Sequence, residues 1–125
     1  MKIKESAENY LEAIFILNKK NGAVRSIDIA NYLSFTKASV SVAMKSFREG
    51  GYINVDGAGN ITLTEKGTCI ASQMYERHNI IARALIALGV DEDTAYSDSC
   101  KIEHHISEQS FNKIKEYLIE KEIIE

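Results

Sequence analysis

The chain has 125 residues, of which 45% are hydrophobic, so it can form one compact domain or two small lobes that share a long helix. Its net charge of −3 argues against a nonspecific polyanion binder, and two cysteines are too few for a disulfide framework. We expect Cys69 to lie in the core and Cys100 to be a possible ligand. The longest apolar run, interrupted by Arg83, is too short to span a bilayer, and no secretory signal is visible. We therefore expect a cytoplasmic protein with no membrane partner.

The charge is unevenly distributed along the chain. Residues 1–66 carry 9 Lys and Arg against 7 Asp and Glu, whereas residues 67–125 carry 6 against 11. A mildly basic half joined to an acidic half suits a protein that contacts DNA at one end and attracts cations at the other.

Three helices are predicted in the first half of the chain. Apolar residues recur at helical spacing over residues 5–19, with Ser6 as the expected N-cap. A second helix is predicted over residues 26–33, and a third, capped by Thr36, over residues 37–49. The short segment between the second and third helices has the length of the turn in a helix-turn-helix.

The predicted third helix has two different faces. One is apolar and carries Val40, Ala43, Met44 and Phe47. The opposite face carries Lys37, Ser41, Lys45 and Arg48. Long cations and small hydroxyls on one stripe suit phosphate and base-edge contacts in a major groove. A solvated helix face produces the same pattern, so the stripe alone leaves both interpretations open.

A hairpin is predicted after these helices, with strands over residues 52–55 and 61–64 around the glycine-rich turn 56–60. Three helices followed by a hairpin is the order of a winged helix, whose wing contacts the DNA backbone or minor groove. We therefore expect a mainly α fold. An N-terminal winged helix-turn-helix domain (residues 1–66, three helices plus a β-hairpin wing) precedes an α-helical dimerisation and metal-binding domain (residues 67–125).

Three more helices are predicted in the second half. The longest covers residues 65–88, and Gly67 in its first turn allows close packing at a cost of about 1 kcal/mol in helix propensity. Asp91 or Asp93 is the expected cap of the fifth helix, and Ser107 opens the sixth. The fifth and sixth helices are too short for a core of their own, so we expect them to pack on the long helix and on a second copy, as a homodimer.

Cys100, Glu103 and His104 fall at i, i+3 and i+4 on the predicted fifth helix, which extends to about His105. Such spacings place side chains on one helix face. A thiolate, a carboxylate and an imidazole can hold a divalent transition metal when another segment adds ligands. His78 on the long helix is a further candidate ligand. A plain helix face remains the alternative to a metal site.

Several motifs occur in one order along the chain: Glu8-Asn-Tyr-Leu-Glu-Ala-Ile14, the winged-helix head, Glu76-Arg-His78, Gly89-Val-Asp-Glu92 and Cys100-x-x-Glu-His-His-Ile-Ser107. With these motifs the chain resembles the diphtheria toxin repressor family of iron- and manganese-dependent transcriptional regulators over essentially its whole length. The resemblance implies a repressor of metal-ion homeostasis and not an enzyme. Such a repressor binds a palindromic operator in double-stranded DNA as a dimer when loaded with Mn²⁺ or Fe²⁺.

Carried over residue by residue, the resemblance implies metal ligands at Asn9, Glu12, His78, Cys100, Glu103 and His104. Asn9 departs from the family pattern, in which manganese-type members have Asp and iron-type members have Met. The iron-type second-site positions hold Ala82 and Tyr96 here, so that site cannot be complete. The short chain resembles the manganese type, whereas the softer Cys100 ligand resembles the iron type.

The resemblance also places the DNA-reading positions on the third helix. The resemblance and the polar face of the third helix together give the expected DNA contacts, which are Thr36, Lys37, Ser39, Ser41, Val42, Lys45 and Arg48. Ala38 and Val42 suit apolar contacts to thymine methyl groups.

Two other functions compete with this one. The first is a winged-helix regulator with altered or lost metal control, which the neutral Asn9 keeps open. The second is a metalloenzyme that uses Cys100, Glu103 and His104 around an open coordination position. The sequence offers neither a separate acid-base group nor a substrate loop for such an enzyme.

Overall fold

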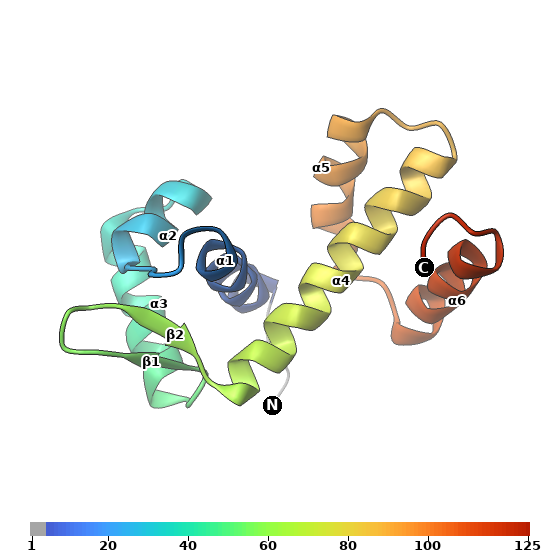
Figure 1. Cartoon of the computed structure of the whole chain (residues 1–125). Helices are drawn as coiled ribbons and strands as arrows, with labels where there is room; N and C mark the ends of the chain where they lie inside the picture. Colours follow the sequence, from blue (N-terminus) through green and yellow to red (C-terminus); the bar gives the residue numbers. More distant parts are fainter. Residues whose placement is uncertain (1–4) are drawn as a thin grey trace. The chain divides into compact units, whose positions relative to one another are not determined.

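The computed structural model describes residues 5–125, which form six α-helices and one two-stranded antiparallel sheet (Figure 1). Tertiary contacts divide the chain into two compact units, Met1–Gln73 and Met74–Glu125. The predicted mainly α fold, a winged helix-turn-helix followed by further helices, is confirmed. The predicted domain boundary between residues 66 and 67 stays a prediction. Within residues 5–125, no helix combines the length and apolar character that crossing a membrane requires.

The first unit has the element order of a winged helix: α1 (Glu5–Asn21), α2 (Ser26–Leu33), α3 (Lys37–Glu49), β1 (Ile53–Val55) and β2 (Ile61–Leu63). Helix α2 packs on α1 and α3, and the hairpin contacts α1 and α3. The predicted ranges of α2 and α3 are confirmed. Helix α1 already includes Glu5, so Ser6 lies inside it and the prediction that Ser6 is the N-cap is wrong. The residues that would cap α1 lie outside the described residues.

Local interactions fix the start of α3. Thr36 is its N-cap, and the Thr36 Oγ1 accepts a hydrogen bond from the backbone N–H of Ser39 at 3.1 Å. Such a cap satisfies a donor that the first helical turn leaves without an intrahelical partner. Ser34 ends α2 in the left-handed conformation, with φ of 59°, which turns the chain between the two helices. Thr36 therefore determines where the exposed face of α3 begins.

The core of the first unit lies between the three helices and the hairpin. Its fully buried side chains come from each of these elements and include Leu11, Ile14, Val24, Ile29, Val40, Ile53 and Ile61. Each contributes roughly 1.5–3 kcal/mol of hydrophobic free energy when it leaves water. Phe47 of α3 packs edge-on against Tyr10 of α1, with ring centroids 5.8 Å apart. This packing holds α3 with its polar face outward.

The wing is a short hairpin closed by one carboxylate. Ile53 pairs with Leu63 and Val55 with Ile61. At the tip, Oδ1 of Asp56 accepts hydrogen bonds from the backbone N–H groups of Ala58 and Asn60, both at 2.9 Å. These bonds, led by the one from Asn60, hold the pKa of Asp56 below its usual value. The turn is therefore fixed by its own residues.

Gly67 in the first turn of α4 (Glu65–Ala87) is required by a close backbone approach. A Cβ atom at this position would collide with the backbone carbonyl oxygen of Tyr52. The predicted close packing at Gly67 is thus present, between the first turn of α4 and the backbone of Tyr52. It places the start of α4 directly against the residue that leads into β1.

The second unit contains the rest of α4 with α5 (Glu92–Ile102) and α6 (Glu108–Glu120). Of the two predicted caps of α5, Asp91 is the N-cap, and Ser107 caps α6 as predicted. Its core comprises Ile80, Ile81, Phe111 and Leu118, with partly buried neighbours that include Ala84, Leu85, Ile106, Ile114, Ile123 and Ile124. The prediction that α5 extends to about His105 is wrong, because regular helix ends at Ile102 and a turn follows.

Cys69 is exposed on α4, and the prediction that it lies in the core is wrong. Its sulfur accepts a hydrogen bond from Nε2 of Gln73, one helical turn later, at 3.8 Å. Free cysteines are usually buried, which was the reason for the prediction. Cys69 is exposed because it lies on the outer side of α4.

Candidate metal centre and nucleic-acid interface

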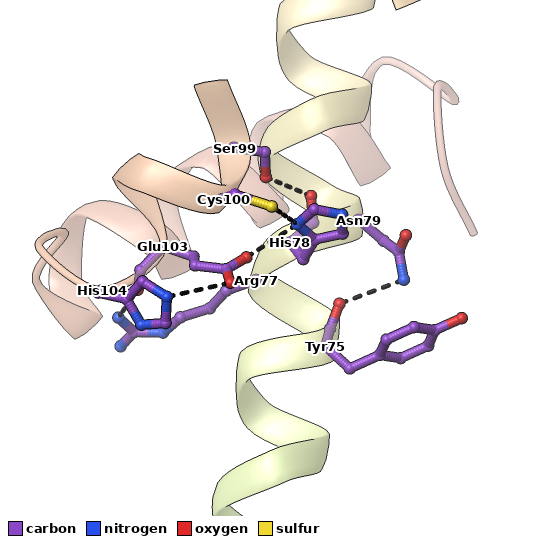
Figure 2. A network of polar contacts seen from close by, with 8 residues as sticks. All are labelled: Tyr75, Arg77, His78, Asn79, Ser99, Cys100, Glu103 and His104. Carbon is purple, nitrogen blue, oxygen red and sulfur yellow. Dashed lines mark hydrogen bonds and ion pairs between the residues drawn. The ribbon is translucent and has the colours of Figure 1, made fainter. Parts of the chain in front are cut away.

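Three ligand-type side chains of the second unit converge between α4 and α5 (Figure 2). Nδ1 of His78 lies 3.0 Å from Oε2 of Glu103 and 3.6 Å from the sulfur of Cys100. One ligand atom from each residue lies within 4.8 Å of the other two. Nitrogen, sulfur and carboxylate oxygen are donors that divalent transition metals accept, and one ion can contact all three at this spacing. The residues present therefore fit a metal ion.

The end of α5 provides two of these donors. Cys100 lies in its last turn, and Glu103 is the C-cap, with helical φ and ψ of −57° and −27°. Because Glu103 continues the helical path past Ile102, the i, i+3 spacing still places both side chains on the face that meets His78. Cys100 is exposed and Glu103 is fully buried, so the cluster extends from solvent into the unit.

The buried Glu103 carboxylate contacts an imidazole on each side. Oε2 faces His78, and Nε2 of His104 lies 3.3 Å from Oε1, at ion-pair distance but outside hydrogen-bond geometry. Within the described residues, Oε1 accepts no hydrogen bond. A buried carboxylate is costly unless positive charge or donors compensate it. This arrangement favours a cation beside Glu103.

The protonated ring of His78 provides positive charge at this position. Hydrogen bonds from its ring to Cys100, first, and to Glu103 raise the pKa of His78 to about 10, against the opposing effect of burial. At neutral pH the imidazole is therefore protonated, and Nδ1–H points at the sulfur and the carboxylate together. Tyr96 packs beside the ring at a centroid distance of 5.5 Å. A metal held by Nδ1 of His78 would require the loss of this proton.

The other predicted ligands lie elsewhere in the chain. His104 is in the turn after α5, with its side chain buried, and contacts Glu103 on the side away from His78 (Figure 2). Asn9 and Glu12 lie on α1 in the first unit, where Glu12 is buried. Their membership of the ligand set stays a prediction. The structure thus brings together His78, Cys100 and Glu103, with His104 next to Glu103.

Two polar residues beside the cluster, Ser99 and Arg77, were not predicted from the sequence. The Ser99 hydroxyl, fully buried, donates a short hydrogen bond to the backbone carbonyl of His78. Nη1 of Arg77 donates to the backbone carbonyls of Glu103, at 3.2 Å, and Ile106, at 2.9 Å. Both residues are next in sequence to a predicted ligand. Neither has a side chain of the type that binds metals, so the spacing of ligand-type residues could not identify them.

All seven predicted DNA-contacting residues lie on one continuous exposed surface segment, from the N-cap of α3 along its outer face. Val42 is 71% exposed, although α3 buries Val40, Met44 and Phe47 on its other face. An apolar side chain this exposed, flanked by Lys and Ser, suits contact with base edges better than a solvated surface. Their contacts with DNA stay a prediction.

Ser26 is a further candidate for this surface. It lines two shallow grooves along α3 together with Ser41. One groove also contains Lys37, and the other contains Lys45 and Arg48. Because Ser26 is the first residue of α2, backbone N–H groups without intrahelical partners lie next to it. Hydroxyls, lysines and a helix N-terminus are groups that contact DNA phosphates.

Comparison with known proteins assigns both halves of the chain. Residues 2–60 match the iron dependent repressor N-terminal DNA binding domain, and residues 64–122 match the iron dependent repressor metal binding and dimerisation domain. An uncharacterized HTH-type transcriptional regulator of Methanocaldococcus jannaschii is 32% identical over 118 residues, 93% of this chain and 94% of the relative. The HTH-type transcriptional regulator MntR of Lysinibacillus sphaericus is 34% identical over 109 residues, which cover 87% of this chain and 78% of the relative.

Solved structures share the fold. A manganese-dependent transcriptional repressor in complex with manganese superposes with a TM-score of 0.82 and 24% identity, covering 90% of this chain and 52% of that one. A hypothetical protein from Sulfolobus solfataricus gives a TM-score of 0.69 at 23% identity, and the match covers 93% of this chain and 89% of that one. The chain belongs to the iron dependent repressor family, which is the diphtheria toxin repressor family expected from the sequence. Members of this family are metal-dependent transcriptional regulators with a DNA-binding and a dimerisation domain.

Proposed function

We propose that this protein is a repressor of metal-ion homeostasis genes that binds a palindromic operator as a homodimer when loaded with Mn²⁺ or Fe²⁺. The observation that carries the proposal is the convergence of His78, Cys100 and Glu103 in a chain that also has an exposed recognition helix. Two symmetry-related α3 helices suit half-sites one or more helical turns apart. The protein would act in the cytoplasm, on the cell's DNA, and the metal would serve regulation and not catalysis.

The proposed ligand set is His78, Cys100, Glu103 and His104 with Asn9 and Glu12. The family is named for iron, one relative of known structure is a manganese-dependent repressor, and imidazole and carboxylate ligands suit both metals. Cys100 is softer than a carboxylate and favours Fe²⁺ over Mn²⁺. Asn9 contributes only a neutral oxygen, so a regulator with altered metal control is the second candidate.

The test uses the purified protein and fluorescently labelled DNA from upstream of its own gene. Anisotropy is measured with chelator and then with added Mn²⁺, Fe²⁺ under anaerobic conditions, or Zn²⁺. A metal-dependent gain in affinity that disappears in Cys100→Ser supports the proposal. Equal binding with chelator and with each metal supports the second candidate, and no binding to DNA under any condition contradicts both.

A further inference from the structure

We propose that Arg77 is a positioning residue that holds the metal ligand Glu103 in place through the backbone at the end of α5. This inference rests on the proposed metal-binding function. Arg77 immediately precedes His78 on α4. Glu103 is therefore held twice by consecutive residues, at its carbonyl by Arg77 and at its carboxylate by His78 (Figure 2).

The backbone contact matters because α5 has just ended. The last carbonyl groups of a helix have no intrahelical partners. Backbone hydrogen bonds from His105 and Ile106 to the carbonyl of Ile102 close the turn after α5, whereas the carbonyls of Glu103 and Ile106 are bonded by Arg77. Nη1 of Arg77 bridges two carbonyls of this turn, those of Glu103 and Ile106. The bridge fixes the turn that contains Glu103 and His104. Without it, the buried carboxylate would lose its fixed direction towards His78 and Cys100.

Arg77 is itself half-buried and rests against the core of the second unit. Its guanidinium carbon lies 5.4 Å from the ring centroid of Phe111, a buried residue of α6. Cation–π contact and partial burial limit the rotamers that the side chain can adopt. The guanidinium is planar and rigid, so it can direct the N–H groups of one nitrogen towards two carbonyls while its plane lies against a ring, which a lysine cannot do.

Charge and positioning predict opposite effects of removing Arg77. A positive charge next to the cluster repels a metal cation, so charge alone predicts tighter binding in Arg77→Gln. Positioning predicts weaker binding in Arg77→Gln and also in Arg77→Lys, which keeps the charge. Loss of residues that orient metal ligands typically lowers metal affinity about 10–100-fold. We expect losses in this range for both variants.

The test is a Co²⁺ titration of the full chain, followed by calorimetry and by absorption. Co²⁺ bound to Cys100 gives a thiolate charge-transfer band, and its d–d bands report the geometry of the whole ligand set. In both Arg77 variants we expect the charge-transfer band to persist, the d–d bands to shift and the affinity to fall. Arg83→Gln is the matched control, because Nη2 of Arg83, also on α4, donates to the carbonyl of Ile123 at 3.0 Å, away from the cluster.

Unchanged Co²⁺ affinity and spectrum in folded Arg77→Lys would overturn the inference, as would tighter binding in Arg77→Gln or an equal loss in Arg83→Gln. Should Arg77→Gln fail to fold, Arg77→Lys and Phe111→Leu carry the test, since the latter removes the ring beneath the guanidinium and keeps an apolar side chain at this core position. Failure of the native protein to bind Co²⁺ or Mn²⁺ would instead contradict the proposed function. The two failures are therefore distinguishable.

Discussion

Nδ1 of His78 and Oε2 of Glu103 lie 3.0 Å apart, although 25 positions separate the two residues in sequence. The contact joins α4 to the end of α5 and places a positive imidazolium beside a buried carboxylate and a thiol. Because the pKa of His78 is raised to about 10, its ring is protonated at neutral pH where it contacts the two other groups that we propose as ligands. A metal must displace this proton, which makes metal binding depend on pH.

The first prediction follows from the raised pKa of His78. Its value of about 10 means that metal binding at neutral pH releases the Nδ1 proton. At any pH below the pKa of His78, the apparent affinity for Mn²⁺ should fall as the pH is lowered. The expected loss is about tenfold per pH unit for each proton that metal binding releases. Calorimetry in buffers of different ionisation enthalpy measures the number of protons. His78→Gln should release one proton fewer, and His105→Gln, a histidine outside the proposed ligand set, should behave as the native protein does. Equal proton release by the native protein and His78→Gln would contradict this assignment.

The second prediction concerns the two kinds of contact on α3. Lys45 lies among exposed cations, so Lys45→Ala should weaken binding to all DNA sequences alike and reduce the salt slope by about 0.9. Val42 is exposed and apolar, so Val42→Ala should instead change the preference for thymine at one position and leave the slope unchanged. Anisotropy titrations at several salt concentrations measure both. Lys20→Ala, an exposed lysine at the end of α1, is the control and should alter neither quantity; a reversed pattern at Lys45 and Val42 would exchange their roles.

The third prediction concerns the contact between α4 and the residue that leads into the wing. Gly67→Ala would improve helix propensity by about 1 kcal/mol, but its Cβ would collide with the backbone carbonyl of Tyr52. Because backbone cannot rotate away as a side chain can, we expect a net destabilisation of about 1–3 kcal/mol in urea unfolding. Thr68→Ala, at the next and exposed position, should change stability by less than about 0.5 kcal/mol. A stabilised Gly67→Ala protein would show that the contact yields easily.

Local signals predicted most of the fold. Thr36, Asp91 and Ser107 mark helix starts correctly because a capping side chain acts on its own first turn. The end of α5 was misplaced because Glu103, although it lies past the last helical residue, keeps helical dihedral angles and a backbone hydrogen bond to Ser99. Spacing along the chain singled out Cys100 and Glu103, but it could not reveal Ser99 or Arg77. Their contacts bridge 21 to 29 positions, and only the packing of α5 on α4 creates them.

The fourth prediction concerns the surface that forms the dimer. In the second unit an apolar groove is lined mainly by residues of α4 and α6. Leu88, directly after α4, is 82% exposed, and Tyr117 of α6 is 57% exposed. Side chains this apolar and exposed are typical of a protein interface. Leu88→Lys should therefore shift sedimentation at micromolar concentration towards monomer. Ile27→Lys, an exposed apolar position in the first unit, is the control and should leave the dimer intact. An undisturbed dimer in Leu88→Lys would place the interface elsewhere.

The fifth prediction is reciprocal coupling between metal and operator DNA. If metal tightens DNA binding, then DNA must tighten metal binding by the same factor, typically about 5–150-fold or about 1–3 kcal/mol. Mn²⁺ titrations with and without operator measure one direction, and DNA titrations with and without Mn²⁺ measure the other. Cys100 is exposed, so Cys100→Ser should keep the fold while losing much of the coupling, and Glu103→Gln should lose it with the buried volume preserved. Cys69→Ser, the exposed cysteine outside the proposed ligand set, should retain it. A metal controls DNA binding only through the ligands that hold it. If Cys100→Ser and Glu103→Gln form folded dimers and keep the full metal-dependent gain in DNA affinity, this cluster is ruled out as the regulatory site.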